Sequence, residues 1–370
     1  MDNLPLLFLD GGLGTTLEAP PYNVRFTSET PLWSSHLLLT DPNTLRDVHR
    51  AFVDAGADIV LTATYQTSIE GFIHTDPKYT REDAVRYMRS AIPLARGAFS
   101  PSRAHSRPLD AGKVALGKVA LSLGPYGATM TPVSTEYTGL YSAEMDSEDA
   151  LRKWHADRLR LFTEDDASWD GIVYVAFETV KRADEVRAIR GAVRDVISGT
   201  TRKPWWICGV FPSEEVDENE VRQWVRAALG PARDRDQNRN DNACLPRPWG
   251  IGLNCTRIGN VEHIVRVMED ELALLIREDG FTDEWAATRS GRPWLVLYPD
   301  GTRGERYDPA TKQWVKTEGE EPVQPWEDMF CEVVEGIKRR QNAWEGLVLG
   351  GCCRTGPREI AALARKVGVK

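Results

Sequence analysis

The sequence predicts an α/β fold, a closed (β/α)8 TIM-type barrel with loop insertions. Eight short apolar runs alternate along the chain with eight segments that have a helical pattern. The runs are continuously apolar, which is typical of strands covered on both faces of a sheet. Repeated strand–helix units indicate parallel strands, and eight such units indicate closure into a barrel. An open, doubly wound sheet is the alternative arrangement of the same units.

The predicted strands are short runs, several of them rich in β-branched residues, and most are followed directly by a helical segment. They cover residues 6–10, 58–65, 119–124, 171–179, 205–211, 250–256, 293–300 and 346–351. The helices are expected at 42–55, 81–99, 147–166, 181–196, 218–229, 260–277, 326–341 and 357–368. The first of these helices has Asp41 as a candidate N-cap and Pro42 at a first-turn position, both typical of a helix start.

Two stretches look like insertions into the repeated units. Residues 231–247 are polar and charged, which predicts a surface loop. Residues 301–323 are charged and rich in glycine and proline, and they follow the seventh strand, so they are expected at the C-terminal rim of the barrel. There they either help to cover a site or form a surface loop without a functional role. With both insertions included, we expect one domain over residues 1–370.

Composition and charge narrow the class of protein. The chain has 370 residues and a formal net charge of −9, without a basic stripe, which argues against nucleic acid or an anionic membrane as the partner. No apolar run is long enough to cross a bilayer, and the N-terminus lacks the features of a signal peptide. Six cysteines in such a chain are expected to stay reduced, and we expect a cytoplasmic location.

Chemistry in a (β/α)8 barrel lies at the C-terminal ends of the strands. Those ends carry two carboxylates, three cysteines and small or amide residues: Asp10 with Gly11 and Gly12, Glu178, Asn254 with Cys255, and Cys352 with Cys353. Three thiolates from two strand ends suit Zn²⁺ with one coordination position left open. A buried cysteine that acts as a small hydrophobe is the other interpretation, and it is preferred for Cys208 and Cys331. Cys244 lies in the 231–247 insertion and is not expected to be a ligand.

Other readings of these motifs are weaker. A phosphate-binding role for DGGLGT lacks the G-x-G-x-x-G spacing, no helix is expected directly after it, and Asp10 would repel phosphate. Glu178 has a structural alternative, an ion pair with Lys181 or Arg182. No Ser–His–Asp arrangement is indicated, because the six histidines fall in loops or helices, where surface or packing roles are expected: His36, His49, His74, His105, His155 and His263.

Several motifs occur in one order from end to end: DGGLGTTLE, TATYQTSIEGF, GPYGA followed by EYTG, FET, GLNCT and GGCCRT. Together they resemble the homocysteine S-methyltransferase family, most closely its betaine-independent branch, which uses S-methylmethionine or S-adenosylmethionine. After GPYGA this chain has TMTPVS where that branch commonly has a segment like YLADGS, a difference that bears on donor preference. The resemblance implies a zinc-binding barrel in which Cys255, Cys352 and Cys353 are the ligands.

The same resemblance implies the substrate contacts. Asp10 and Glu178 match acidic residues that hold the amino group of homocysteine. Gly11, Gly12 and Asn254 match neighbouring positions of the substrate pocket.

The function expected from these residues is the zinc-dependent transfer of a methyl group from a sulfonium donor to the thiolate of L-homocysteine, which gives methionine. A free thiol has a pKa near 8.5, and metal coordination removes its proton. A sulfonium is already activated by its charge, so no catalytic side chain is expected. A methyltransferase that acts on selenocysteine or another thiol is the alternative, and a zinc-binding barrel without turnover is the third reading.

Overall fold

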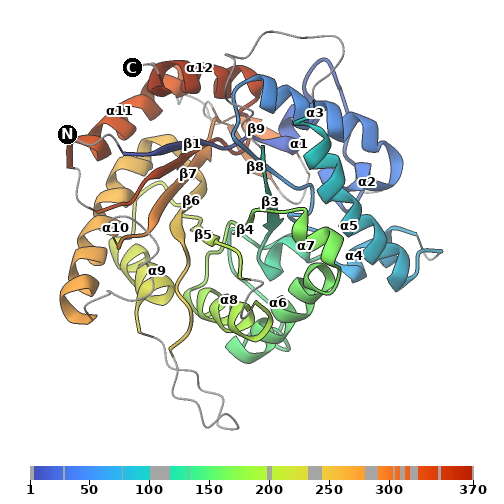
Figure 1. The fold of residues 1–370 in the computed structure, drawn as a ribbon, viewed down its shortest axis with the longest axis horizontal. Coiled ribbons are helices and arrows are strands. Elements are labelled where there is room, and N and C mark those ends of the chain that lie inside the picture. Colours follow the sequence, from blue (N-terminus) through green and yellow to red (C-terminus); the bar gives the residue numbers. More distant parts are fainter. Residues whose placement is uncertain are drawn as a thin grey trace.

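Eight parallel strands form the sheet at the centre of the molecule (Figure 1). The computed structural model describes residues 4–27, 30–76, 78–100, 117–131, 133–197, 202–231, 244–279, 291–302, 305–308, 313–316, 324–340 and 343–368. The strands are β1 (Leu6–Phe8), β2 (Ile59–Leu61), β3 (Lys118–Leu123), β4 (Tyr174–Phe177), β5 (Trp205–Gly209), β6 (Gly250–Arg257), β7 (Trp294–Asp300) and β10 (Leu347–Leu349). All eight predicted strands are confirmed.

The strand order closes the sheet into a barrel. It runs β1–β10–β7–β6–β5–β4–β3–β2, and a parallel bridge between Leu9 and Ile59 joins the two ends. The amide of Asp10 also donates to the carbonyl of Ile59 at 3.1 Å. The (β/α)8 prediction is therefore confirmed, and the open sheet is excluded.

Helices surround the barrel on its outer face (Figure 1). They are α1 (Leu13–Glu18), α2 (Leu37–Thr40), α3 (Pro42–Asp54), α4 (Ile69–Thr75), α5 (Arg81–Gly97), α6 (Glu148–Thr163), α7 (Asp166–Asp170), α8 (Ala183–Val196), α9 (Glu218–Leu229), α10 (Ile258–Asp279), α11 (Trp326–Arg340) and α12 (Pro357–Gly368). All eight predicted helices are present. The Asp41 side chain caps α3 by accepting a hydrogen bond from the Thr44 amide at 3.1 Å, and Pro42 is its first residue, as predicted.

One local expectation is wrong, because α1 begins directly after Gly12. This helix has six residues, no side-chain cap and no acidic residue in its first turn. The usual sequence signals of a helix start are therefore missing, which is why the pattern does not reveal it. The buried Asp10 carboxyl just before it remains the argument against a phosphate site at this point.

The core has two parts, one inside the barrel and one between the strands and the helices. Along β7 the side chains alternate, with Val296 and Tyr298 inside the barrel and Leu295 and Leu297 packed against the helices. Cys208 lies in the inner cluster and is fully buried, so its interpretation as a small hydrophobe is confirmed. The barrel interior is therefore filled by side chains, which leaves its C-terminal mouth as the place for a site.

The two predicted insertions are only partly covered by the structure. Most of 231–247 lies outside the described residues, and Cys244 at its end is exposed. Within 301–323 the structure describes an antiparallel pair, β8 (Glu305–Asp308) and β9 (Gln313–Lys316), and the rest of that prediction lies outside the described residues. Glu305 forms an ion pair with Arg354 at 3.0 Å. The insertion therefore meets the chain next to the Cys352–Cys353 pair, at the C-terminal rim.

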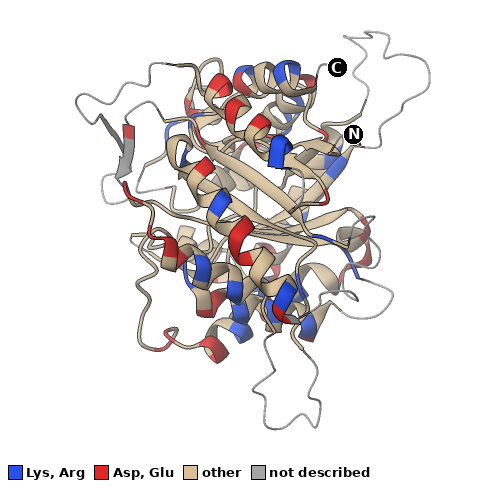
Figure 2. Cartoon of the chain, turned by 90° about the vertical axis from the view of Figure 1, so that its left-hand side faces the viewer, with Lys and Arg blue, Asp and Glu red and all other residues tan. Residues whose placement is uncertain are grey.

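Charged residues lie mainly on the outer helices. Figure 2 shows acidic and basic residues interspersed there, while the strands are largely uncharged. No helix among the described residues has the length and hydropathy that a membrane span requires.

Candidate active site

A cavity of about 750 Å³ lies at the C-terminal ends of the barrel strands. All eight site residues predicted from the sequence line it: Asp10, Gly11, Gly12, Glu178, Asn254, Cys255, Cys352 and Cys353. They come from four strand ends that are far apart in the chain, after β1, after β4, in β6 and after β10. The barrel thus brings the predicted set together around one space. Their individual roles stay predictions.

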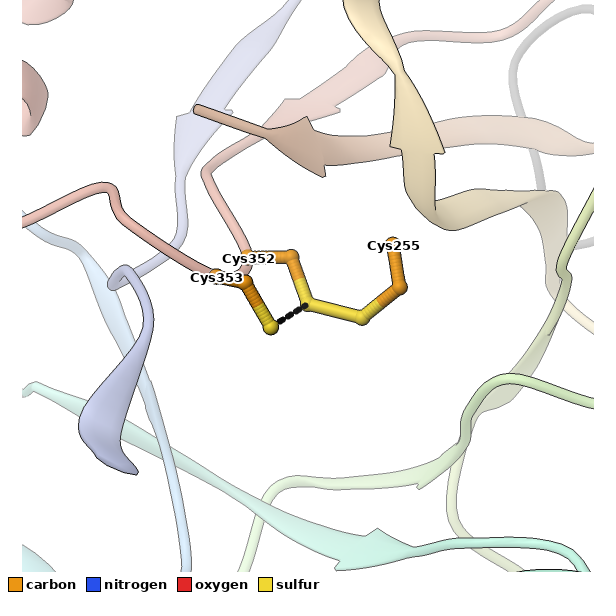
Figure 3. A group of neighbouring side chains, drawn as sticks. All are labelled: Cys255, Cys352 and Cys353. Carbon is orange, nitrogen blue, oxygen red and sulfur yellow. Dashed lines mark hydrogen bonds between the residues drawn. A yellow bond between two sulfur atoms is a disulfide. The ribbon is translucent and has the colours of Figure 1, made fainter. Parts of the chain in front are cut away.

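Three cysteine sulfurs meet in this cavity (Figure 3). The Sγ atoms of Cys255, Cys352 and Cys353 all lie within 4.8 Å of one another, and those of Cys352 and Cys353 are 4.0 Å apart. Zn–S bonds of about 2.3 Å in a tetrahedral site place the sulfurs about 3.8 Å apart. The three sulfurs are therefore close enough to share one zinc ion when all three are thiolates.

The structure joins two of these cysteines, Cys255 and Cys352, by a disulfide. The expectation that all six cysteines are reduced is therefore wrong for this pair. The two residues are 97 positions apart in sequence, but the barrel brings their Cα atoms to 5.4 Å, a separation that a disulfide can span. A disulfide and a three-thiolate metal site are alternative states, because the oxidised pair has no thiolate to offer.

Two glycines allow the end of β1 to lie against the segment that carries the cysteine pair. A Cβ at Gly11 would lie 2.3 Å from the carbonyl oxygen of Thr355, and one at Gly12 would lie 2.3 Å from that of Cys352. The amide of Gly12 donates to the Thr355 carbonyl at 2.9 Å. A Cβ at either position would clash with a backbone carbonyl of the segment that carries the cysteines. Glycine is therefore required for Cys352 to lie where it does.

We expect Gly12→Ala to destabilise the fold by about 1–3 kcal/mol, as overpacking does, and to weaken metal binding because the cysteine segment must move. Gly259→Ala is the matched control, because a Cβ there meets nothing within 4 Å. Urea unfolding and the zinc content of both variants test this expectation. Equal zinc content and equal stability in the two variants would contradict it.

Asp10 and Glu178 place two buried carboxyls in the cavity. Asp10 is 2% exposed, and its Oδ2 accepts a hydrogen bond from the Leu61 amide at 2.9 Å. Its Oδ1 is buried and has no hydrogen-bond partner among the described residues. Burial raises the pKa of Asp10 well above its ordinary value, and the charge of Glu178 raises it further. An unfilled acceptor beside a second carboxyl suits a cation that donates hydrogen bonds.

Glu178 is 5% exposed and accepts a hydrogen bond from the Ser122 hydroxyl. Burial raises its pKa to about 7, although the contacts with Ser122 and Tyr298 and the charge of Arg158 act in the opposite direction. A cationic ligand next to this carboxyl would lower its pKa again and favour the ionised form.

The alternative ion pair of Glu178 with Lys181 or Arg182 is wrong. Lys181 pairs with Glu220 at 2.5 Å, and Arg182 pairs with Asp184 at 2.5 Å. Glu178 lines the cavity, whereas the two basic residues are not among its lining residues. Closeness in sequence is misleading here, because the strand end directs Glu178 into the barrel mouth while the chain leaves toward α8.

Asn254 connects two strand ends through its side-chain amide. Its Oδ1 accepts from the Thr179 amide at 2.7 Å, and its Nδ2 donates to Thr179 Oγ1 at 2.7 Å and to Cys255 Sγ at 3.3 Å. Thr179 and Cys255 both have positive φ, 59° and 46°, a conformation that costs of order 1–3 kcal/mol for such residues. These contacts hold the strained backbone and the sulfur in place. A direct contact of Asn254 with substrate stays a prediction.

Two residues that matter for the geometry of the cavity are not among those predicted from the sequence. Glu136, in the EYTG motif, lines the cavity, and burial raises its pKa to about 7. Arg158 of α6 is buried and donates to the carbonyls of Gly124, Thr64 and Tyr65 at 2.7–2.8 Å. It thereby holds the C-terminal ends of β2 and β3 together. The acidic residue after the third strand is a signal that could have identified Glu136, whereas an arginine inside a helix gives none.

Most of the histidines that the structure describes are packed in the interior or lie on the surface, as expected. His155 is buried and contacts Glu185 at 3.0 Å, and His49 is buried in α3, where burial lowers its pKa to about 4. His263 lies on the surface beside Glu218. His74 is exposed and lines the cavity. His105 lies outside the described residues.

Comparisons with known proteins agree with this arrangement. Residues 7–367 match the family model described as homocysteine S-methyltransferase. Betaine-homocysteine S-methyltransferase of Drosophila melanogaster is 31% identical over 370 residues, which cover 99% of this chain and 95% of that protein. Homocysteine S-methyltransferase YbgG of Bacillus subtilis (strain 168) is 28% identical and covers 99% and 97%. Selenocysteine Se-methyltransferase of Brassica oleracea var. italica is 29% identical and covers 97% and 88%.

Solved structures share the fold. The metallated form of the homocysteine methyltransferase MmuM from Escherichia coli aligns with a TM-score of 0.63 and 24% identity, over 98% of this chain and 96% of that one. Its oxidised form aligns with a TM-score of 0.62 and 23% identity, with the same coverage. The match of the family model over almost the whole length decides the assignment. This chain belongs to the homocysteine S-methyltransferase family, and it is a methyltransferase.

Proposed function

We propose that this enzyme transfers a methyl group from a sulfonium donor, S-methylmethionine or S-adenosylmethionine, to the thiolate of L-homocysteine in a zinc-dependent reaction that gives methionine. The observation that carries the proposal is the meeting of three cysteine sulfurs and two buried carboxyls in one cavity. The sulfurs suit a soft metal and a substrate thiol, and the carboxyls suit an ammonium group. Homocysteine carries both groups on one small molecule.

Cys255, Cys352 and Cys353 would hold the zinc ion once the disulfide is reduced. Three protein thiolates leave a tetrahedral ion one position for a ligand from outside, which is typical of catalytic rather than structural zinc. When bound, Zn²⁺ would lower the pKa of a coordinated substrate thiol, so that the thiolate is available at neutral pH. Asn254 would keep the sulfur of Cys255 in position through its N–H···S contact.

Asp10 and Glu178 would bind the ammonium group of homocysteine. The free Oδ1 of Asp10 and the carboxyl of Glu178 offer acceptors in a site where both are buried. An ammonium between them relieves the mutual repulsion of the two carboxyls and keeps both ionised. Fixing this end of homocysteine orients its sulfur toward the donor, and such positioning lowers the barrier of a two-substrate reaction.

The reaction balances without an acid or base from the protein. A lone pair of the homocysteine sulfur forms the new S–C bond to the methyl carbon, after the thiol proton has been released to solvent. The old C–S bond breaks, and its electron pair stays on the donor sulfur, which becomes a neutral thioether. Positive charge disappears in the transfer, so no oxyanion stabilisation is needed. Methionine, itself a neutral thioether, is a weaker ligand for the site and can leave.

Two wider proposals accompany this function. We propose that residues 1–370 form a single homocysteine-binding domain, and that the enzyme works in the cytoplasm, where cysteines are kept reduced.

Selenocysteine as acceptor is the alternative function, because one relative at 29% identity is named for it. Betaine is included as a donor in the test, because another relative is named for it. A zinc-binding barrel without turnover is the remaining alternative.

The test is methionine formation by the reduced, zinc-loaded protein, with S-methylmethionine, S-adenosylmethionine and betaine each offered to homocysteine. We expect a sulfonium donor to be preferred and one zinc per chain to be required. Chelation should abolish the activity, and zinc together with a thiol reductant should restore it. Full activity after chelation would contradict the zinc dependence. A faster reaction with selenocysteine than with homocysteine would favour the alternative acceptor.

A further inference from the structure

A third buried carboxyl, that of Glu136, lines the active-site cavity. Glu136 lies between β3 and α6 and is 9% exposed, and the sequence predicts no individual role for it. One of its oxygens, Oε2, is buried without a hydrogen-bond partner among the described residues. A buried carboxylate oxygen without a donor is costly, which suggests that a ligand supplies one.

The segment that carries Glu136 is well anchored. The amide of Thr135 donates to the carbonyl of Gly127 at 2.9 Å, and the amide of Gly139 donates to that of Thr135 at 2.8 Å. A Cβ on Gly127 would lie 2.8 Å from the Glu136 nitrogen, so the backbone at Gly127 and the backbone at Glu136 are in close contact. Tyr126 donates its amide to the buried Glu185 carboxyl at 2.8 Å. Glu136 is therefore held in place before any ligand binds.

The charge of the cavity selects cations. Its described lining residues include three carboxyls, Asp10, Glu136 and Glu178, and neither a lysine nor an arginine. Asp10 and Glu178 are held at the strand ends by their contacts with Leu61 and Ser122, whereas Glu136 lies on the loop between β3 and α6. The cavity thus has one carboxyl pair at the strand ends and a separate carboxyl on this loop. The first suits the ammonium of homocysteine, and the second is left for the other substrate.

An α-amino acid sulfonium has two cationic groups, and they differ in what they offer to a carboxylate. An ammonium donates N–H hydrogen bonds, which Glu136 Oε2 lacks, whereas a sulfonium has no N–H. A carboxylate against the sulfonium would also be a competing nucleophile for the methyl group, and the product would be a methyl ester. The ammonium is therefore the better partner for Glu136.

We propose that Glu136 binds the α-ammonium group of the methyl donor and thereby selects sulfonium donors that are amino acids. This inference rests on the proposed function, since it names the donor class of the same site. It makes Glu136 a specificity-determining residue, separate from the two carboxyls assigned to homocysteine.

The test compares two donors that share a dimethylsulfonium group and a carboxylate. S-methylmethionine carries an ammonium, and dimethylsulfoniopropionate does not. We expect the wild type to prefer S-methylmethionine. In Glu136→Gln, kcat/KM for S-methylmethionine should fall roughly 10- to 100-fold, the range of one charge-assisted hydrogen bond, while that for dimethylsulfoniopropionate and the KM for homocysteine change less than about twofold. Glu144→Gln, at an exposed site in the same connection, is the matched control and should behave like wild type.

Several outcomes would overturn the assignment. A rise in the homocysteine KM of Glu136→Gln would move Glu136 to the acceptor end, and equal losses with both donors would place it against the sulfonium. No loss with either donor would remove it from the donor site. Titration calorimetry with S-methylmethionine and no homocysteine measures binding without turnover, so Glu136 is tested even if the proposed methyl transfer is not observed. The donor preference of the wild type tests the same idea if the variant does not fold.

Discussion

Cys353→Ala is expected to lose its bound zinc and to make methionine more than about 100-fold more slowly than wild type. The sulfur of Cys353 lies within 4.8 Å of the other two, and the two remaining thiolates do not complete the three-ligand set of a catalytic zinc site. Without the metal, the homocysteine thiol keeps an ordinary pKa near 8.5 and is mostly protonated at neutral pH. Zinc-to-protein stoichiometry and methionine formation, measured on the same reduced sample, test both parts.

Cys353 is the informative choice among the three cysteines. It is a free thiol, so replacing it leaves the Cys255–Cys352 pair as it is, and the variant does not alter disulfide formation. Cys244→Ser is the matched control, because that exposed thiol lies outside the cavity and should leave zinc content and rate unchanged. A Cys353→Ala protein with one zinc per chain and full activity would show that the third ligand comes from elsewhere.

Glu178→Gln should raise the KM for homocysteine about 10- to 100-fold and leave the zinc content unchanged. The amide keeps the size of the side chain and its contact with Ser122, but it removes the charge that is assigned to the substrate ammonium. Initial rates at low and at saturating homocysteine separate this effect from a general loss of activity. Full activity at low homocysteine would mean that Glu178 does not hold the ammonium.

The same variant tests the pKa of Glu178. Burial raises that pKa to about 7, so in the free wild type the carboxyl is half protonated near neutrality. Binding of a cation needs the ionised form, so homocysteine affinity should weaken as the pH falls below about 7. The contribution of Glu178 to this pH dependence should be absent in Glu178→Gln.

Folding stability should decrease as the pH rises, whereas homocysteine affinity should increase. The folded pKa of about 7 lies above the ordinary value of 4.5, so the folded state binds the proton more tightly than the unfolded chain does. Folding stability is therefore lost as the pH rises from about 4.5 to about 7, by about 3 kcal/mol in total. Glu178→Gln avoids this loss and should be more stable than wild type at pH 8, with the difference vanishing at low pH. Denaturant unfolding of the metal-free proteins at several pH values checks the sign.

Much of the site could be read from the chain because a parallel barrel imposes its own geometry. Once eight strands are recognised, their C-terminal ends must share one mouth, so Asp10, Glu178, Cys255 and the Cys352–Cys353 pair must converge. The short-range partners of these residues follow no such rule. Glu178 contacts Ser122, 56 positions away, and not the nearby Lys181, because the pleat of the strands decides which neighbours share the interior.

By itself, the sequence determined the barrel, the order of its strands and helices, and the residue types at its mouth, since these depend on local periodicity and on the identity of residues at strand ends. Only the tertiary structure decided the rest. It brought Cys255 within disulfide distance of Cys352, required glycine at 11 and 12, and turned Glu136 into the same cavity. These features depend on the approach of segments distant in sequence, and that approach is set by strand register and packing, which no local pattern encodes.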